Sequence, residues 1–174
     1  MGRRTQEGET LEQYKQRMID PISESYCAAK WYNATIWLGH GQTASCHHPP
    51  GHWIPLEELK DNYTAIHNTK HKKLMRKYMQ EGKRPAECEY CWKVEDMGKN
   101  HVSDRTFKTE IFKDEDIHKS AEMPWDENVM LRTLEISFDR ACNFSCSYCN
   151  PAFSTAWVKA VSYTHLRAHE TEAD

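Results

Sequence analysis

Apolar residues fall into short runs along this chain, and none approaches the roughly 18 residues of a membrane span. Two of the runs predict strands. Residues 31–38, "WYNATIWL", are rich in β-branched and aromatic types, and the "GHGQTASC" that follows indicates a hairpin turning near Gly39 to Gly41. Residues 131–138, "LRTLEISF", predict a buried strand that leads directly into a cysteine-rich loop.

The remaining apolar positions predict helices with recognisable boundaries. Thr10 is a suitable N-cap for "LEQYKQRM", and Pro85 starts a helix that carries "CEYCWKVED". A longer helix is expected over "TKHKKLMRKYMQE", with Asn68 as its cap and Gly82 just beyond its end. Its basic run at residues 70–77 predicts a solvated helix face. A further helix begins at "FSTAWVKA", after the cysteine loop.

Composition narrows the class of protein. The 174 residues carry a net charge of −3, and 39% of them are hydrophobic, which suits one modest domain or a small domain with part of another. The near-neutral charge gives no reason to expect a nucleic-acid partner. The opening "MGRRTQEGET" has no apolar segment behind its arginines and is not a signal peptide. We therefore expect a cytoplasmic protein without a membrane partner.

A reducing compartment changes how the seven cysteines are interpreted. Disulfides are rare there, and grouped cysteines more often bind metal or perform chemistry. The seven divide into four and three. Cys142, Cys146 and Cys149 have the spacing C-x3-C-x2-C between the predicted strand and the following helix. Three thiolates at this spacing can hold three irons of a [4Fe–4S] cluster and leave the fourth iron open to a small chelating ligand.

The segment "LEISFDRACNFSCSYC" resembles the first strand and cluster loop of the radical S-adenosylmethionine (radical SAM) superfamily, including the aromatic Tyr148 beside the cluster. The resemblance implies that Cys142, Cys146 and Cys149 bind a [4Fe–4S] cluster whose open iron chelates S-adenosylmethionine. One electron then cleaves the sulfonium and gives a 5′-deoxyadenosyl radical that abstracts hydrogen from a substrate. It also implies a flavodoxin- or ferredoxin-type reductant, and it assigns no catalytic residue beyond the cluster ligands.

The other four cysteines suggest a closed four-thiolate site. Cys88 and Cys91 form C-x2-C at a helix start, and a hairpin with Gly41 at its turn would deliver Cys27 and Cys46. Residues 22–97 are similar to the twitch or SPASM-type modules that hold an auxiliary [4Fe–4S] cluster, although such modules usually follow the barrel. A structural zinc site remains open, because spacing alone does not separate zinc from iron–sulfur.

Several polar residues near these cysteines are candidates for further metal ligands or for contacts with a substrate. Three histidines follow Cys46 and could replace a thiolate, although exposed loop positions are expected for each of them: His47, His48 and His52. "SDR" at residues 103–105 offers polar groups to a substrate, with a surface turn as the favoured interpretation.

The predicted fold class is α/β: an α+β N-terminal module with a β-hairpin and helices, followed by the first strand and cluster loop of an incomplete radical SAM (β/α) barrel. The predicted parts are a helical lead-in, the auxiliary-cluster module, a polar linker, the start of the barrel and a tail: 1–21, 22–97, 98–127, 128–160 and 161–174. Residues 161–171, "VSYTHLRAHET", resemble translated sequencing adapter, so native sequence is expected to stop near Ala160.

The sequence thus predicts an N-terminal fragment of a radical SAM enzyme with an auxiliary cluster for electron transfer. We expect such a fragment to be inactive alone and poorly folded beyond about residue 125, because its strand would lack parallel partners. Peptides, sugars and small alcohols all remain open as substrates. The alternatives are a non-catalytic four-cysteine zinc module and a ferredoxin-like electron carrier.

Overall fold

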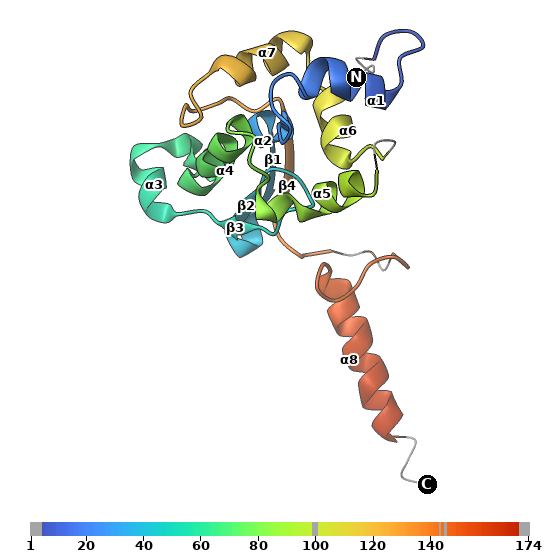
Figure 1. Ribbon diagram of the computed structural model, residues 1–174. Coiled ribbons are helices and arrows are strands. Elements are labelled where there is room, and N and C mark those ends of the chain that lie inside the picture. The colour runs from blue at the N-terminus through green and yellow to red at the C-terminus, as the bar shows by residue number, and fades with distance from the viewer. Residues whose placement is uncertain (1–4, 99–100, 143, 145, 171–174) are drawn as a thin grey trace. The chain divides into compact units, whose positions relative to one another are not determined.

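The computed structural model describes residues 5–98, 101–142, 144 and 146–170, which form two compact units (Figure 1). The first unit contains the described residues up to Ile36 together with those of Gly41–Ile136, and the second contains Trp37–His40 and those beyond Ile136. In the described part of the chain, no helix combines the length and apolar character needed to cross a membrane. The boundary between units falls within the sheet and not at the predicted linker.

The elements follow one another in a mixed α/β order. They are α1 (Leu11–Tyr14), a π-helical turn (Lys15–Ile19), α2 (Ala29–Tyr32), β1 (Asn33–Trp37), a 3-10 turn (Leu38–His40), β2 (Gln42–Ala44), β3 (His52–Trp53), α3 (Leu56–Asp61), a 3-10 turn (Tyr63–Ile66), α4 (Lys70–Gln80), a 3-10 turn (Ala86–Cys88), α5 (Glu89–Asp96), α6 (Asp104–Glu110), α7 (Asp114–Glu122), β4 (Thr133–Ser137) and α8 (Thr155–Glu170).

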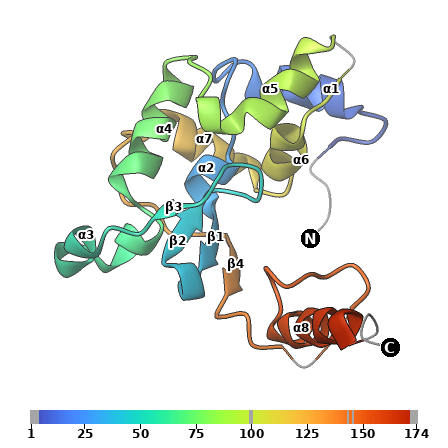
Figure 2. The ribbon, with the colours of Figure 1, turned by 90° about the horizontal axis from the view of Figure 1, so that it is seen from below.

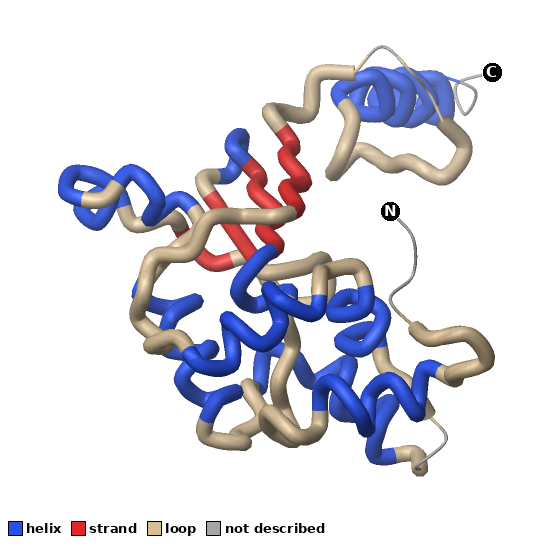
Figure 3. Tube along the Cα trace, turned by 90° about the horizontal axis from the view of Figure 1, so that it is seen from above, coloured by secondary structure: helices blue, strands red, loops and turns tan. Residues whose placement is uncertain are grey.

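The predicted hairpin is present and forms the centre of a four-stranded sheet with the order β3-β2-β1-β4 (Figure 3). Gly41 has a φ of +64°, a left-handed conformation that glycine adopts without a Cβ clash, and β2 begins immediately after it. β2 pairs antiparallel with β3, with Gln42 opposite Trp53. The preceding segment differs from the prediction, because residues up to Tyr32 form the short helix α2 before β1 starts.

The strand before the cysteine loop has a partner in this chain, contrary to expectation. The Thr133 side chain of β4 donates to Asn33 Oδ1 of β1 at 2.5 Å, and the Thr35 side chain donates to Glu135 at 3.1 Å. Residue numbers rise together along the two strands, as in a parallel pair. The expectation that β4 would have no strand to pair with is therefore wrong, whereas poor folding beyond residue 125 stays a prediction.

The prediction that this strand is buried is also wrong. β4 lies at the edge of the sheet, and its apolar residues Leu134 and Ile136 are 55% and 37% exposed. An edge strand has one neighbour only, so its outer side and part of its faces stay open to solvent. The apolar sequence of β4 thus indicates a strand that could be buried, while the described residues of the first unit leave its apolar side chains exposed.

The hydrophobic core of the first unit surrounds α2. Trp31 is fully buried on this helix and packs against Tyr26 with ring centroids 5.2 Å apart. α2 contacts both α4 and α6, and the views in Figures 1 and 2 place α3 away from α6, beyond α4. The predicted N-cap at Thr10 is confirmed, and its capping box with Gln13 starts the chain of helices that closes over this core.

The basic run of α4 is not a solvated face. Lys72 and Arg76 are 1% and 0% exposed, and each is held by backbone carbonyl groups of neighbouring segments. Lys72 Nζ donates to the Asn33 carbonyl at 2.6 Å, and Arg76 donates to the carbonyls of Lys30 and Glu127 at 3.1 and 3.0 Å. Burial lowers the pKa of Lys72 well below its ordinary value. Through these hydrogen bonds the two basic side chains join α4 to the sheet and to α2.

The cap of α4 also differs from the prediction. The Thr69 side chain caps the helix by accepting a hydrogen bond from the Lys72 amide. Asn68 does not cap the helix and forms other hydrogen bonds. The Asn68 side chain donates to the Val129 carbonyl and accepts from the Val129 amide and from Arg76, at 3.0, 3.2 and 2.8 Å. A side chain with both donor and acceptor groups is required at this junction, which explains why Asn68 is buried.

The segment predicted as a linker, residues 98–127, contains α6 and α7 and belongs to the core. Phe112 and Ile117 are 2% and 0% exposed within the main apolar group of the first unit. Tyr26 forms a hydrogen bond with Ser120 at 2.5 Å, and Thr109 accepts from the Ala28 amide at 3.1 Å. A few apolar anchors combined with buried polar contacts therefore fix a segment whose sequence is mostly hydrophilic.

Candidate metal centre

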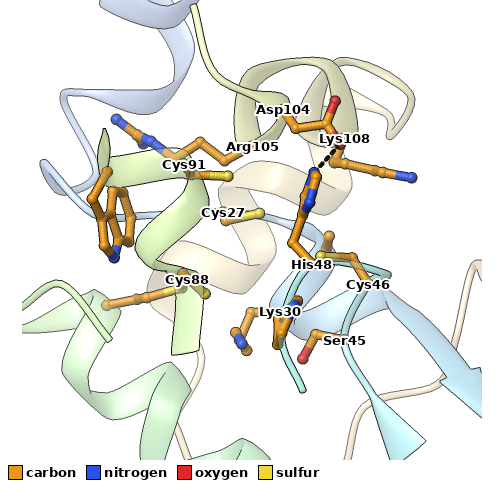
Figure 4. Close-up of a pocket in the computed structure, with 14 residues that line it drawn as sticks. Cys27, Lys30, Ser45, Cys46, His48, Cys88, Cys91, Asp104, Arg105 and Lys108 are labelled. Atoms are coloured by element: carbon orange, nitrogen blue, oxygen red, sulfur yellow. Dashed lines mark hydrogen bonds and ion pairs between the residues drawn. The ribbon is translucent and has the colours of Figure 1, made fainter. Parts of the chain in front are cut away.

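The four upstream cysteines line one pocket of the first unit (Figure 4). Cys27 precedes α2, Cys46 follows β2, and Cys88 and Cys91 lie at the start of α5. Cys88 and Cys91 are buried, and Cys27 and Cys46 are partly buried. Three segments that are well separated in the sequence thus line a common space, and metal binding by these four residues stays a prediction.

Local structure explains how the cysteines reach this position. The helix predicted after Pro85 is confirmed as a 3-10 turn followed by α5, with Cys88 at the junction. The spacing C-x2-C places Cys91 one turn further along the same side of the helix. Trp92 fixes the helix, because its indole NH donates to the Pro85 carbonyl at 2.8 Å and its ring is 6% exposed.

Burial makes the pocket unfavourable for bare thiolates. It raises the pKa of Cys27 to about 12 and that of Cys88 to about 11, and it raises the pKa values of Cys46 and Cys91 as well. Metal ligation requires the deprotonated sulfur, so a bound cation must displace these protons. The pocket is therefore suited to thiolates only when positive charge accompanies them.

Backbone amides point at three of the sulfur atoms. The amides of Ala29, His48 and Arg105 form hydrogen bonds with Cys27, Cys46 and Cys91, respectively. Each of these hydrogen bonds lowers the pKa of its cysteine, against the larger effect of burial. Amide hydrogen bonds of this kind stabilise anionic sulfur and tune iron–sulfur sites.

Three cationic side chains also line the pocket: Lys30, Arg105 and Lys108. Lys30 is 2% exposed and forms an ion pair with Glu87. Burial alone would lower the pKa of Lys30, but the neighbouring Cys88 and Glu87 raise it above its ordinary value. Lys30 therefore remains charged beside the thiols.

Arg105 is held rigidly between an acid and the backbone next to Cys27. Its Nε and Nη2 atoms donate to the two carboxylate oxygens of Glu95 at 2.6 and 2.9 Å, and its Nη1 atom donates to the Tyr26 carbonyl at 2.7 Å. Ser103 and Arg105 are both buried, so the favoured interpretation of "SDR" as a surface turn is wrong for these two residues. The motif positions the cysteine segment from α6.

Acid is expected to weaken the fold through Glu87. Burial would raise the pKa of this carboxyl, but the hydrogen bond from His71 at 2.5 Å and the charge of Lys30 outweigh it and hold the pKa at about 2. Because the pKa of Glu87 is lower in the folded than in the unfolded chain, the ionised carboxylate stabilises the fold above pH 4.5. This stabilisation is lost as the pH falls towards 2. Urea unfolding of the metal-free chain between pH 6 and pH 3 should show a loss of about 2 kcal/mol attributable to Glu87.

Two variants separate this effect from general acid sensitivity. Glu87→Gln should lower the free energy of unfolding at pH 6 and flatten its decline towards pH 3. Glu89→Gln, at an exposed position on α5, should leave the decline as in the unsubstituted chain. Equal slopes for all three proteins would contradict the assignment.

The spacing of the sulfur atoms bears on the kind of metal group. Four thiolates 2.3 Å from one zinc ion lie about 3.8 Å apart in a tetrahedron. Among the described residues, which include all four cysteines, no three of their sulfur atoms lie within 4.8 Å of one another. The four described cysteines therefore share a pocket without forming a compact ligand set in this arrangement.

The three downstream cysteines lie in the second unit, on the predicted loop between β4 and α8. Cys142 is exposed, and Cys146 and Cys149 are partly exposed. The Cys149 amide donates to the Cys146 carbonyl at 3.0 Å, and the Trp157 indole of α8 donates to the same carbonyl at 3.1 Å. The loop thus turns back on itself and is tied to the first turns of the helix.

Tyr148 lies beside these thiols, and its place next to a bound cluster stays a prediction. Its side chain is 89% exposed, and a hydrogen bond with Cys146 raises the pKa of Tyr148, with smaller contributions from Cys149 and Cys142. The Cys142 amide donates to the Thr155 hydroxyl at 3.2 Å, which connects the start of the loop to α8. The predicted helix after the cysteines is confirmed and continues to Glu170, beyond the expected end of native sequence at Ala160.

The three histidines after Cys46 take different positions. His47 is half exposed and His48 lines the pocket, where it bonds to Asp104 at 2.8 Å. His52 begins β3 and bonds to Thr69 at 2.8 Å, and burial lowers the pKa of His52 to about 4. The expectation of exposed loop positions is therefore confirmed for His47 and wrong for His48 and His52.

Sequence reasoning missed the charged residues around the thiols. Lys30 and Arg105 stand 58 and 14 residues from the nearest C-x2-C cysteine, so no local pattern connects them to the site. Their sequence signal is weak: Lys30 lies three residues after Cys27, and Arg105 lies in the polar motif "SDR", for which a surface turn was the favoured interpretation.

Family models, curated proteins and solved structures were compared with this chain, and none of them matches it.

Proposed function

We propose that this chain is the N-terminal part of a radical SAM enzyme with an auxiliary iron–sulfur site. The observation that carries the proposal is the meeting of Cys27, Cys46, Cys88 and Cys91 in one pocket, separate from the second group of three cysteines. Four protein ligands would occupy every iron of an auxiliary [4Fe–4S] cluster, whereas three protein ligands leave one iron open to another ligand. The division of seven cysteines into these two groups therefore has a chemical purpose.

The four thiol groups of the pocket form a donor set that suits a [4Fe–4S] cluster as well as a single zinc ion. Lys30, Arg105 and Lys108 supply positive charge around the thiolates, and backbone amides donate to three sulfur atoms. With four protein ligands, the site would transfer electrons rather than bind substrate.

The downstream loop supports the SAM-binding assignment. Cys142, Cys146 and Cys149 lie between a strand and a helix, at exposed positions that a small cosubstrate can reach. When bound there, a [4Fe–4S] cluster supplies the electron that cleaves S-adenosylmethionine to the 5′-deoxyadenosyl radical. The loop's own residues orient its ligands: Trp157 and Thr155 of α8 hold the backbone of Cys146 and Cys142.

The exposed edge of β4 supports the interpretation as part of a larger barrel. Leu134 and Ile136 face solvent on a strand whose apolar sequence suits burial by neighbouring strands. Further parallel strands would pair with this edge and cover it. The substrate remains open among peptides, sugars and small alcohols, because residues that select it would lie on those strands.

The test is iron, sulfide and zinc per chain after anaerobic reconstitution. We expect about eight irons in the unsubstituted chain and about four in the Cys142→Ala/Cys146→Ala/Cys149→Ala variant. The Cys88→Ala/Cys91→Ala variant should retain the other four. One zinc without sulfide, unchanged in the triple variant, would instead favour a non-catalytic zinc module. About four irons, unchanged in the triple variant, would favour a ferredoxin-like carrier.

A further inference from the structure

A group of nitrogen and oxygen ligands lies at the rim of the thiol pocket. His47 and His48 follow Cys46, and Asp104 is the first residue of α6. The Nε2 atoms of His48 and His47 lie 2.8 and 3.6 Å from the same oxygen, Asp104 Oδ2. One ligand atom from each of the three residues lies within 4.8 Å of the other two. Among the described residues, the structure contains this one group of three or more histidine, cysteine or acidic ligands at such spacing.

The surrounding structure holds two of the three ligands in place. The His48 ring stacks on the Tyr90 ring with centroids 4.0 Å apart and an angle of 14° between the planes. Asp104 follows Ser103, whose hydroxyl bonds to Glu95 at 2.5 Å in the buried network of Arg105. Figure 4 shows His48 and Asp104 directed toward each other beside the cysteines. Ligands fixed in this way lose little conformational entropy when they bind.

The side toward solvent is open. His47 is 52% exposed and Asp104 is 30% exposed, so water can complete the coordination of an ion bound between them. Burial, together with the neighbouring His48 and Lys108, lowers the pKa of His47, against the opposing effect of Asp104 and Glu135. Lys108 lies one helical turn from Asp104 and is partly exposed, which lets its flexible side chain turn toward water.

We propose that His47, His48 and Asp104 bind a divalent first-row transition-metal ion, such as Zn²⁺, at a site distinct from the four thiols. Two imidazoles and one carboxylate form a donor set typical of zinc, nickel, copper and iron(II), and less suited to the oxygen-preferring Mg²⁺ and Ca²⁺. The ion would join the loop after Cys46 to the N-terminus of α6. It would therefore close one side of the pocket without using a cysteine ligand.

Co²⁺ is the probe that distinguishes this site from the thiols. Thiolate ligands give cobalt an intense near-ultraviolet charge-transfer absorption, whereas imidazole and carboxylate ligands do not. The full chain, reduced and metal-free, is titrated anaerobically with Co²⁺ and followed by absorption and calorimetry. We expect one ion per chain that binds without thiolate absorption, in addition to any ion that binds with it.

Two substitutions should remove only the ion that lacks thiolate absorption. Asp104→Asn can keep the hydrogen bond to His48 while removing the anionic ligand, and His47→Ala removes a half-exposed ring. We expect at least a tenfold weaker affinity in each variant. His118→Ala, at an exposed position on α7, is the matched control and should bind as the unsubstituted chain does.

The outcome is independent of which group the thiols hold. Far-ultraviolet circular dichroism and the thiolate absorption of each variant establish that the fold and the neighbouring site persist. Unchanged binding in Asp104→Asn would overturn the proposal, as would an equal loss in His118→Ala. If His47→Ala alone disturbs the fold, Asp104→Asn decides the result.

Discussion

Loading the four upstream thiols with their metal group is expected to raise the free energy of unfolding by about 4 kcal/mol when free metal exceeds its dissociation constant a thousandfold. Cys27, Cys46 and the Cys88/Cys91 pair come from three segments separated by 19 and 42 positions. The unfolded chain does not hold them together, so binding favours the folded state alone. Anaerobic urea unfolding, followed by far-ultraviolet circular dichroism, measures the difference between metal-free and loaded protein.

Matched serine variants assign this gain to the pocket. Cys46→Ser should fold without metal and gain little on loading, because one of the four ligands is missing. Cys142→Ser, in the exposed downstream loop, should keep the gain in full. Identical unfolding midpoints for metal-free and loaded unsubstituted protein would show that the four thiols do not share a metal group.

Glu95→Ala is expected to destabilise the metal-free chain by about 3–5 kcal/mol. The Glu95 and Arg105 side chains are 8% and 2% exposed, and their two hydrogen bonds measure 2.6 and 2.9 Å. Removal of the acid leaves the buried guanidinium without its hydrogen-bonded carboxylate, and the Asp20 oxygen that remains lies 3.7 Å from its Nη2 atom. The loss should also weaken metal binding, because Arg105 holds the Tyr26 carbonyl next to Cys27. Urea unfolding gives the first effect and calorimetric metal titration gives the second.

Two comparisons define the origin of this loss. Glu89→Ala, at a 67% exposed position on the same helix, should cost less than about 1 kcal/mol. The double variant Glu95→Leu/Arg105→Met should recover much of the stability, because apolar residues can replace a buried ion pair. It should not recover metal affinity, since the contact with the Tyr26 carbonyl is lost. A cost below 1 kcal/mol for Glu95→Ala would contradict the role given to the pair.

The sequence was sufficient for features encoded by neighbouring residues. The hairpin at Gly41, the cap at Thr10 and the helix after Pro85 all depend on local backbone preferences, and all three are present. The separation of the cysteines into four and three could be read from spacing and from their positions beside a helix start and a strand end. The chemistry that the two groups perform stays a prediction.

The sequence failed where long-range contacts outweigh local composition. Basic and polar stretches were assigned to the surface, yet Lys72 and Arg76 are buried against carbonyls from distant segments, and Phe112 and Ile117 anchor the supposed linker. In the other direction, Leu134 is apolar but exposed, because burial requires a neighbour that this unit does not provide.

The sequence by itself determined which residues can ligate metal, because donor atoms and spacing are written in the chain. Tertiary structure alone decided that the four distant thiols meet, that Lys30 and Arg105 lie beside them, and that Asp104 approaches His47 and His48. The physical reason is that each of these contacts joins segments tens of residues apart. Packing around α2 sets their separation, and no local preference specifies it.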